Sequence, residues 1–375
     1  MEVDGRAATA ESLTTTQEND LRVARTDPTK WVRNRCHQPT RVFGYITVGA
    51  VLLMVLCIVI STSSSSTASH PQSPSPPPKP PWAPGGVPSP PQMGGNETHV
   101  LLNNGLWMPR LAFAANVWDA STCTSATTAA LDAGFRFVWS SVLVNEPCQL
   151  AQRAAIDSHP TVHRSNIYLA GTVDTAGCPS EDACRTATMA GAREQMSRLG
   201  PEKLDQIMLD YPATRFMTEA TWDSCGPIRG QWAAFTELYT AKEVKSIAVS
   251  NFGPTELECL IGSGAPAGAV IPVVNQLRFA VGHTSGVDLD LNKQHGIVVQ
   301  AYSPLAAGSV LSDPKLASIG AAHTPTRSAA QVAYRYILQR NVTIATQSTN
   351  PAHLQEDVEI FGWRLTDSEM AQLGE

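Results

Sequence analysis

From about residue 100 onward, short apolar segments alternate with amphipathic stretches, and this alternation limits the possible folds more than any other feature. Short apolar runs are typical of buried parallel strands, and the stretches between them, such as 181–199, 230–242 and 328–339, have helical periodicity. Eight such units in about 275 residues predict an α/β fold of the (β/α)8 TIM-barrel type, with its site at the strand C-terminal ends. A doubly wound sheet is the alternative, but no G-x-G-x-x-G motif follows the first strand. The predicted strands are 111–117, 136–141, 167–173, 206–210, 246–251, 273–279, 297–303 and 342–347.

Several blocks of this region, in the same order, resemble the aldo-keto reductase family. LLNNGLWMP at 101–109 resembles the family's opening hairpin and first strand, and ALDAGFRF at 130–137 resembles its A-L-D-A-G-Y-R-H. The resemblance covers nearly all of residues 100–375. It implies a barrel that binds NADPH and reduces aldehydes and ketones. The remaining blocks are WAAFTELYTAKEVKSIAVSNF (232–252), VVNQ (273–276), AYSPL (301–305) and the segment 348–366.

The resemblance also assigns four catalytic positions, and all four are substituted. In the family a tyrosine donates the proton, a lysine and an aspartate lower its pKa, and a histidine orients the carbonyl. The motifs WSSVLVNE, RSNIYLAGTV and DQIMLDYP place Trp139 at the aspartate, Val144 (or Leu143) at the tyrosine, Thr172 at the lysine and Asp210 at the histidine. A general acid contributes about 10²–10⁴ in rate, so we expect the usual reduction to be impaired by at least this factor.

The cofactor positions implied by the resemblance are retained unevenly. Gln347 stands at the lysine that pairs with the 2′-phosphate, and His353 and Asp357 replace an arginine and an asparagine near the adenine. Ala112 and Ala114 replace glycines of the first strand. Because charge-assisted bonds to phosphate are lost, we expect NADP or NAD binding to be weak or lost, with NADH less disfavoured. The matching positions are Ser250, Asn251 and Gln276 at the nicotinamide amide, Tyr302 at its ring, and Ser348 and Glu356 at the adenosine.

Three functions remain open at this point. The leading hypothesis is a pseudoenzyme barrel that binds a protein partner or a small-molecule ligand. One alternative is residual NAD(P)H-dependent carbonyl reductase activity, with water or Tyr211 as the proton donor. The other is a repurposed luminal hydrolase that uses Asp210 and Glu146 as paired carboxylates. The net charge of −6 gives no indication of nucleic-acid binding, and we expect no metal site.

The first hundred residues predict a membrane tether. Residues 42–60 are nineteen uncharged positions, nearly enough for a helix to cross the hydrocarbon core. Arginines and lysines precede this run and are absent directly after it, which favours a type II orientation with the barrel in the extracellular space or a secretory-pathway lumen. Residues 1–41 read as a disordered cytosolic tail, and the Ser/Pro-rich stretch 61–97 reads as a stem that supports a barrel at 98–375.

Two further features agree with that compartment. Asn96 and Asn341 each begin a glycosylation sequon. Six cysteines lie beyond the apolar run, an even number that favours disulfides in an oxidising environment. Six cysteines allow fifteen pairings, and only Cys178 and Cys184 are close enough in sequence to suggest one small loop.

Overall fold

The computed structural model describes residues 95–200, 204–216, 225–262, 265, 269–284 and 286–374. The predicted tail 1–41, the span 42–60 and nearly all of the stem 61–97 lie outside these residues. Within the described ranges, no helix has the length and apolar character needed to cross a bilayer.

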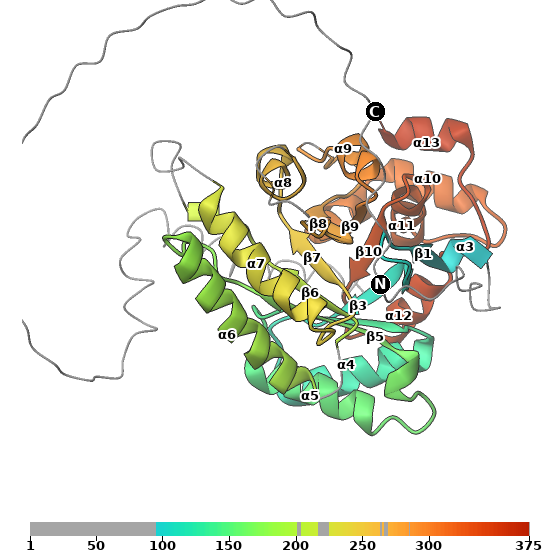
Figure 1. Cartoon of the computed structure of the whole chain (residues 1–375). Helices are drawn as coiled ribbons and strands as arrows, with labels where there is room; N and C mark the ends of the chain where they lie inside the picture. Colours follow the sequence, from blue (N-terminus) through green and yellow to red (C-terminus); the bar gives the residue numbers. More distant parts are fainter. Residues whose placement is uncertain are drawn as a thin grey trace, which may run out of the picture. The chain divides into compact units, whose positions relative to one another are not determined.

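Eight parallel strands close into a barrel, which confirms the predicted (β/α)8 architecture (Figure 1). Strand β10 pairs with β3 and with β9, so the sheet has no free edge. All eight predicted strands are present, and each is shorter than predicted at one or both ends. The strands are β3 (Leu111–Ala114), β4 (Phe137–Ser140), β5 (Tyr168–Val173), β6 (Gln206–Leu209), β7 (Ile247–Ser250), β8 (Val274–Arg278), β9 (Val298–Tyr302) and β10 (Thr343–Thr346).

Helices surround the barrel, and Figure 1 shows α5, α6 and α7 side by side along its outer face. The predicted helix 181–199 matches α6, and the other two predicted helices are recovered within a few residues. The helices are α4 (Ala120–Ala133), α5 (Glu146–Asp157), α6 (Glu181–Leu199), α7 (Gly226–Thr240), α8 (Pro254–Ile261), α9 (Leu289–Gln294), α10 (Pro314–Ala322), α11 (Ala329–Gln339), α12 (Pro351–Val358) and α13 (Asp367–Gly374). Three short 3₁₀ helices are η1 (Arg164–Asn166), η2 (Ala213–Phe216) and η3 (Ala306–Ser312).

Local sequence explains where the helices near the site begin. Asp119, Asn145 and Ser180 each accept a hydrogen bond from the main chain of the first turn, at the N-termini of α4, α5 and α6. Gly134 ends α4 with a φ of 111°, a conformation that costs little only for glycine. The three N-terminal caps fix the ends of the loops that leave the C-terminal ends of β3, β4 and β5.

The N-terminal end of the barrel is closed by a short segment before β3. Helix α3 (Gly95–Thr98) leads into a hairpin of β1 (His99–Leu101) and β2 (Trp107–Pro109). Asn103 and Asn104 of its turn donate to the carbonyls of Pro272 and Lys245, which directly precede β8 and β7. The described chain therefore enters the barrel at its bottom, opposite the strand C-terminal ends.

The barrel interior mixes bulky and small side chains. Phe137, Tyr168 and Met208 are fully or nearly fully buried beside the alanines of neighbouring strands, so the interior is filled by packed layers. Trp139 packs against the same cluster.

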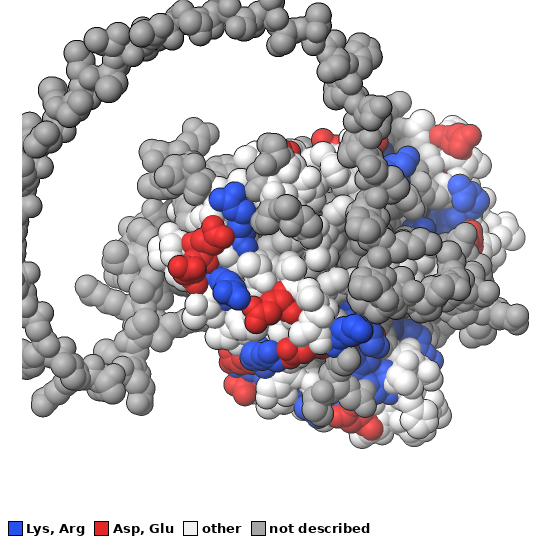
Figure 2. Space-filling model, in the orientation of Figure 1, with Lys and Arg blue, Asp and Glu red and all other residues white. Residues whose placement is uncertain are grey.

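Opposite charges intersperse on the helical face of α6 and α7 (Figure 2). Arg185 pairs with Glu237 at 2.7 Å, and Arg193 pairs with Glu243. The mixture leaves no single-sign patch on this face.

All six cysteines beyond the apolar run form disulfides. They pair as Cys123–Cys148, Cys178–Cys184 and Cys225–Cys259, which confirms the predicted small loop and resolves the fifteen alternatives. Each bond ties down a segment that follows the C-terminal end of a barrel strand.

Candidate functional site

The candidate site is the mouth of the barrel, which we define as the loops and inward-facing side chains at the C-terminal ends of β3 to β10. Polar side chains of neighbouring strands meet there at Ser141, Thr172 and Asp210. The hydroxyls of Ser141 and Thr172 lie 3.1 and 3.2 Å from Oδ2 of Asp210. Both hydroxyls also accept main-chain N–H groups of the β4–α5 loop, from Leu143 and Val142. Their protons are therefore available for the Asp210 carboxyl, and the three groups form one fixed cluster.

The environment of Asp210 changes its acidity. Burial raises the pKa of Asp210 to about 7, and the nearby Asp174 carboxylate adds to the rise. The hydrogen bonds from Ser141 and Thr172 and the charge of Arg215 act in the opposite direction without cancelling it. This carboxyl is therefore close to half protonated at neutral pH and can donate as well as accept a hydrogen bond.

A second network occupies the other side of the mouth. Ser250 Oγ donates to the main-chain carbonyl of Gln276 at 2.9 Å, and Asn251 Nδ2 donates to the main-chain carbonyl of Asp210 at 2.9 Å. Tyr302 donates to Asn251 Oδ1 at 3.0 Å, and Gln276 Nε2 donates to Gln300. The structure thus brings Ser250, Asn251, Gln276 and Tyr302 together at the mouth, where hydrogen bonds within the barrel already engage their side chains.

Two tyrosines at the mouth are poor acids. Burial raises the pKa of Tyr302, and burial raises the pKa of Tyr211 to about 12. The guanidinium of Arg215 lies 3.4 Å from the centre of the Tyr211 ring. Tyr211 is therefore an unfavourable proton donor near neutral pH.

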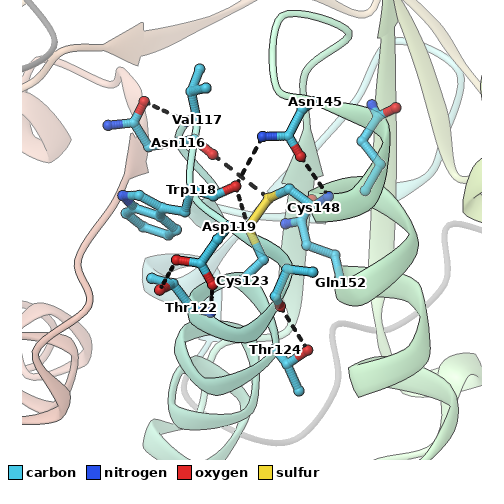
Figure 3. The surroundings of a disulfide bond; sticks show 12 residues. Asn116, Val117, Trp118, Asp119, Thr122, Cys123, Thr124, Asn145, Cys148 and Gln152 are labelled. Atoms are coloured by element: carbon cyan, nitrogen blue, oxygen red, sulfur yellow. Dashed lines mark hydrogen bonds between the residues drawn. A yellow bond between two sulfur atoms is a disulfide. The ribbon is translucent and has the colours of Figure 1, made fainter.

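The disulfide Cys123–Cys148 joins the start of α4 to the start of α5 beside the mouth (Figure 3). Asn145 caps α5 and also donates from Nδ2 to the Trp118 carbonyl at 2.9 Å, so the β3–α4 and β4–α5 loops are bonded twice. Val144 is buried against both half-cystines, together with Ala115 and Ala151. The segment that carries Val144 is therefore held against the α4–α5 side.

Comparison with known proteins decides the family. The aldo/keto reductase family model matches residues 105–375. The chain belongs to the aldo-keto reductase family. It is 28% identical over 297 residues to morphine 6-dehydrogenase of Pseudomonas putida, covering 76% of this chain and 92% of the relative. It is 27% identical over 286 residues to a 9,11-endoperoxide prostaglandin H2 reductase of Trypanosoma cruzi, covering 75% and 92%. A solved aldo/keto reductase of Brucella melitensis superposes with a TM-score of 0.60 at 27% identity, over 74% of this chain and 98% of that chain.

The positions assigned to the catalytic residues of aldo-keto reductases are separated in this structure. Thr172 and Asp210 lie in the polar cluster of the mouth, whereas Val144 packs against the disulfide. Trp139 is half-buried against the interior cluster, and its Nε1 is buried without a hydrogen-bond partner among the described residues. Trp139 thus occupies barrel volume and contributes no charge to the mouth.

The positions at the adenosine end of an aldo-keto reductase groove follow β10. Ser348 Oγ accepts from the main chain of Asn350, whose side chain caps α12. Asp357 is 1% exposed and accepts from Thr346 at 3.4 Å, so its carboxylate supports the barrel wall. Glu356 is half-buried on α12, and its carbonyl accepts from the side chain of Gln331.

The carboxylates considered for hydrolysis have different partners. Glu146 lies in the first turn of α5, is exposed, and pairs with Arg198 at 3.3 Å. Asp174, which sequence reasoning missed, is the carboxylate that acts on Asp210. Ser141 was also missed, although it directly follows β4 and lies two residues after Trp139. Arg215 and Arg278 were missed as well, because no family motif marks them.

Proposed function

We propose that this aldo-keto reductase barrel is a pseudoenzyme with a binding role. The observation that carries the proposal is the environment of Val144, which has no proton to donate and packs in an apolar cluster with Cys123 and Cys148. Aldo-keto reduction needs an acid within about 3 Å of the developing alkoxide. Leu143, the alternative residue for the tyrosine position, likewise has no proton to donate.

The remaining catalytic positions add to this argument. Thr172 has no charge, so it cannot lower the pKa of a neighbouring acid. Its hydroxyl is already committed, since it accepts from Val142 N and donates to Asp210. The half-buried indole of Trp139 occupies the position of a small carboxylate.

We further propose that NADP and NAD bind weakly or not at all. The chemistry of a bound nicotinamide cofactor would be hydride donation. Ser250, Asn251, Gln276 and Tyr302 have the polar groups to hold its amide, but binding would have to break the hydrogen bonds that they already make within the barrel. At the other end, Gln347 offers no positive charge to a 2′-phosphate, and a buried carboxyl group, Asp357, stands where the family has an asparagine.

The proposal includes the location of the barrel. Residues 42–60 would anchor the chain as a single-pass type II membrane protein, and the barrel would stand in the extracellular space or a secretory-pathway lumen. Three disulfides support an oxidising compartment. Asn341 lies in the exposed turn before β10, where an attached glycan would meet solvent.

Residual reduction is the second candidate, and one observation favours it. Asp210, with a pKa near 7, is an acid of suitable strength, and both of its hydroxyl partners contact the same carboxyl oxygen. In this alternative Asp210 would donate the proton in place of the missing tyrosine.

A nucleotide titration separates the two candidates. The Brucella protein is matched over 98% of its chain by this barrel, so residues 95–375 correspond to a whole solved protein and can be purified alone. We expect no saturable change in tryptophan fluorescence with NADPH or NADH up to about 1 mM, a limit near −4 kcal/mol of binding energy. Micromolar binding together with turnover of an aromatic aldehyde would overturn the proposal. Loss of that turnover in Asp210→Asn would then assign the proton to Asp210.

A further inference from the structure

The disulfides of the barrel differ in how closely solvent approaches their sulfurs. Both half-cystines of Cys123–Cys148 are fully buried. Cys178 is half-buried between two exposed neighbours in the chain, whereas its partner Cys184 is fully buried. Exposed disulfides are the labile ones, because an attacking thiolate must reach one of the two sulfurs. Cys178 therefore offers an external thiol a point of attack that Cys123 and Cys148 do not.

The third disulfide, Cys225–Cys259, has a similar exposure but joins different elements. Cys225 is half-buried at the start of α7, and Cys259 is buried in α8. The bond Cys178–Cys184 instead joins the β5–α6 loop (residues 174–180) to the N-terminal part of α6. Cys225–Cys259 is therefore the matched comparison for an effect that belongs to the β5–α6 loop.

The β5–α6 loop carries a charge of the mouth and contacts the next loop. Asp174 directly follows β5 and accepts from the main chain of Ala176 at 3.0 Å, so the turn of the loop fixes the direction of this carboxylate. The main chain of Gly177 donates to the Ala213 carbonyl at 2.9 Å. The conformation of the loop therefore decides where Asp174 points.

The direction of Asp174 matters to the buried carboxyl of the mouth. Burial raises the pKa of Asp210, the Asp174 carboxylate raises it further, and Arg215 lowers it. The negative charge of Asp210 in turn raises the pKa of Tyr211 and of Tyr302. These four side chains, which follow or end β5, β6 and β9, are the titratable and charged groups that act on Asp210 or respond to it.

We propose that Cys178–Cys184 is a reducible bond that controls the conformation of the β5–α6 loop, with a dithiol as its reductant. A thiolate of the dithiol attacks Sγ of Cys178, forms a mixed disulfide and displaces Cys184 as a thiolate, which takes a proton from water. The second thiol of the reductant then closes the reductant's own disulfide and releases Cys178. Two electrons and two protons pass to the cysteine pair, and the dithiol becomes a disulfide.

The reduced barrel keeps its fold. The bond spans a sequence separation of only 6, against 25 and 34 for the other two, so it restricts the unfolded chain least. The reduced thiol of Cys184 has an acceptor in place, because the Cys178 carbonyl lies 3.2 Å from its sulfur. Thr175 stays bonded to α6 at 2.8 Å, so the released segment begins at Ala176, the residue that orients Asp174.

Limited reduction tests which bond opens. The barrel 95–375 is treated with increasing dithiothreitol, alkylated and analysed by peptide mass spectrometry. We expect Cys178 and Cys184 to be alkylated at least ~10-fold faster than Cys123 and Cys148, because the exposed sulfur is attacked first. Equal rates for these two pairs, or release of all six cysteines in one step, would overturn the proposal.

Serine variants test whether the loop follows the bond. The main-chain amides of Gly177 and residue 178 are hydrogen-bonded in the oxidised barrel. In Cys178→Ser/Cys184→Ser these amides should exchange hydrogen at least ~10-fold faster than in the wild type. In Cys225→Ser/Cys259→Ser they should change less than ~2-fold. Equal exchange in the two double variants would show that the bond does not control this loop.

The acidity of Asp210, followed by carbon NMR of its carboxyl, tests the connection to the mouth. Its pKa should fall in Cys178→Ser/Cys184→Ser, because Asp174 is no longer held towards it. The same double substitution should leave the pKa unchanged in an Asp174→Asn background, since asparagine keeps the bond to Ala176 and removes the charge. An unchanged pKa in the first case, or an equal fall in both backgrounds, would refute the role of Asp174.

These tests are separable from the proposed function. None of them involves a nucleotide, so their failure leaves the pseudoenzyme proposal intact. Micromolar NADPH binding with aldehyde turnover would overturn the pseudoenzyme proposal and leave the reducible bond unaffected.

Discussion

Removing the disulfide Cys123–Cys148 should destabilise the barrel more than its position in surface loops suggests. The bond closes a loop with a sequence separation of 25. Removing the bond returns conformational entropy to the unfolded chain, which destabilises the fold by about 3.5 kcal/mol at 25 °C in the chain-entropy model. Both sulfurs are fully buried beside Val144, so their loss adds about 1 kcal/mol of cavity cost. We therefore expect Cys123→Ala/Cys148→Ala to lower the free energy of unfolding by about 4.5 kcal/mol.

The matched control is the disulfide Cys178–Cys184, which has a separation of only 6. The same model assigns it about 2 kcal/mol, so the two double variants should differ by about 2 kcal/mol once the cavity is included. Urea unfolding of both variants and of the wild type, followed by far-UV circular dichroism at equal protein concentration, measures the difference. The reasoning is refuted if Cys178→Ala/Cys184→Ala costs as much as Cys123→Ala/Cys148→Ala, because loop length would then not control the effect.

Three further predictions follow from single residues. Val144→Tyr should lower the free energy of unfolding by about 1–3 kcal/mol without restoring aldehyde reduction, because the new ring meets the disulfide. Urea unfolding measures the stability and NADPH consumption measures the reduction. A gain of turnover would contradict this prediction. The pKa of Asp210 is about 7 in the folded chain, against 3.8 in the unfolded chain. The contribution of Asp210 to the free energy of unfolding is therefore present below about pH 4 and is lost as the pH rises towards 7, by up to about 4 kcal/mol. Asp210→Asn should abolish this part of the pH dependence of stability. The free energies of unfolding of wild type and variant, measured from about pH 5 to 8, should therefore differ by an amount that changes with pH, and parallel curves would refute the shift. Asn341→Gln should remove one glycosidase-sensitive shift in gel mobility after expression through the secretory pathway, and an unchanged ladder would argue against a glycan there.

The fold was predictable because the apolar runs and the helical stretches between them indicate the same architecture. Buried parallel strands read as short apolar runs, and eight of them separated by helical stretches fit one closed barrel. The boundaries were less predictable, since hydrogen bonding ends a strand before its apolar character ends. The segment predicted at 111–117, for example, continues with Ala115 and Val117 on either side of Asn116 after β3 stops at Ala114.

The chemistry of the mouth depends on contacts that the sequence does not display. Ser141 and Asp210 are 69 residues apart, yet their hydrogen bond is part of what sets the acidity of the carboxyl. The sequence located Asp210 through a family motif, but the same motif predicted a histidine and gave no reason to examine Asp174. The pairing of Cys123 with Cys148 was likewise one of many choices until the barrel brought α4 and α5 together.

The residues at the substituted family positions also hold the β4–α5 loop in place. Val144 fills the space beside the disulfide that holds the β4–α5 loop, and that loop exposes Leu143. Thr172 and Asp210 hold the loop from the other side through Val142 and Ser141. A tyrosine returned to position 144 alone would therefore disturb the cluster beside the disulfide, and Thr172 and Asp210 would still stand where the family has a lysine and a histidine.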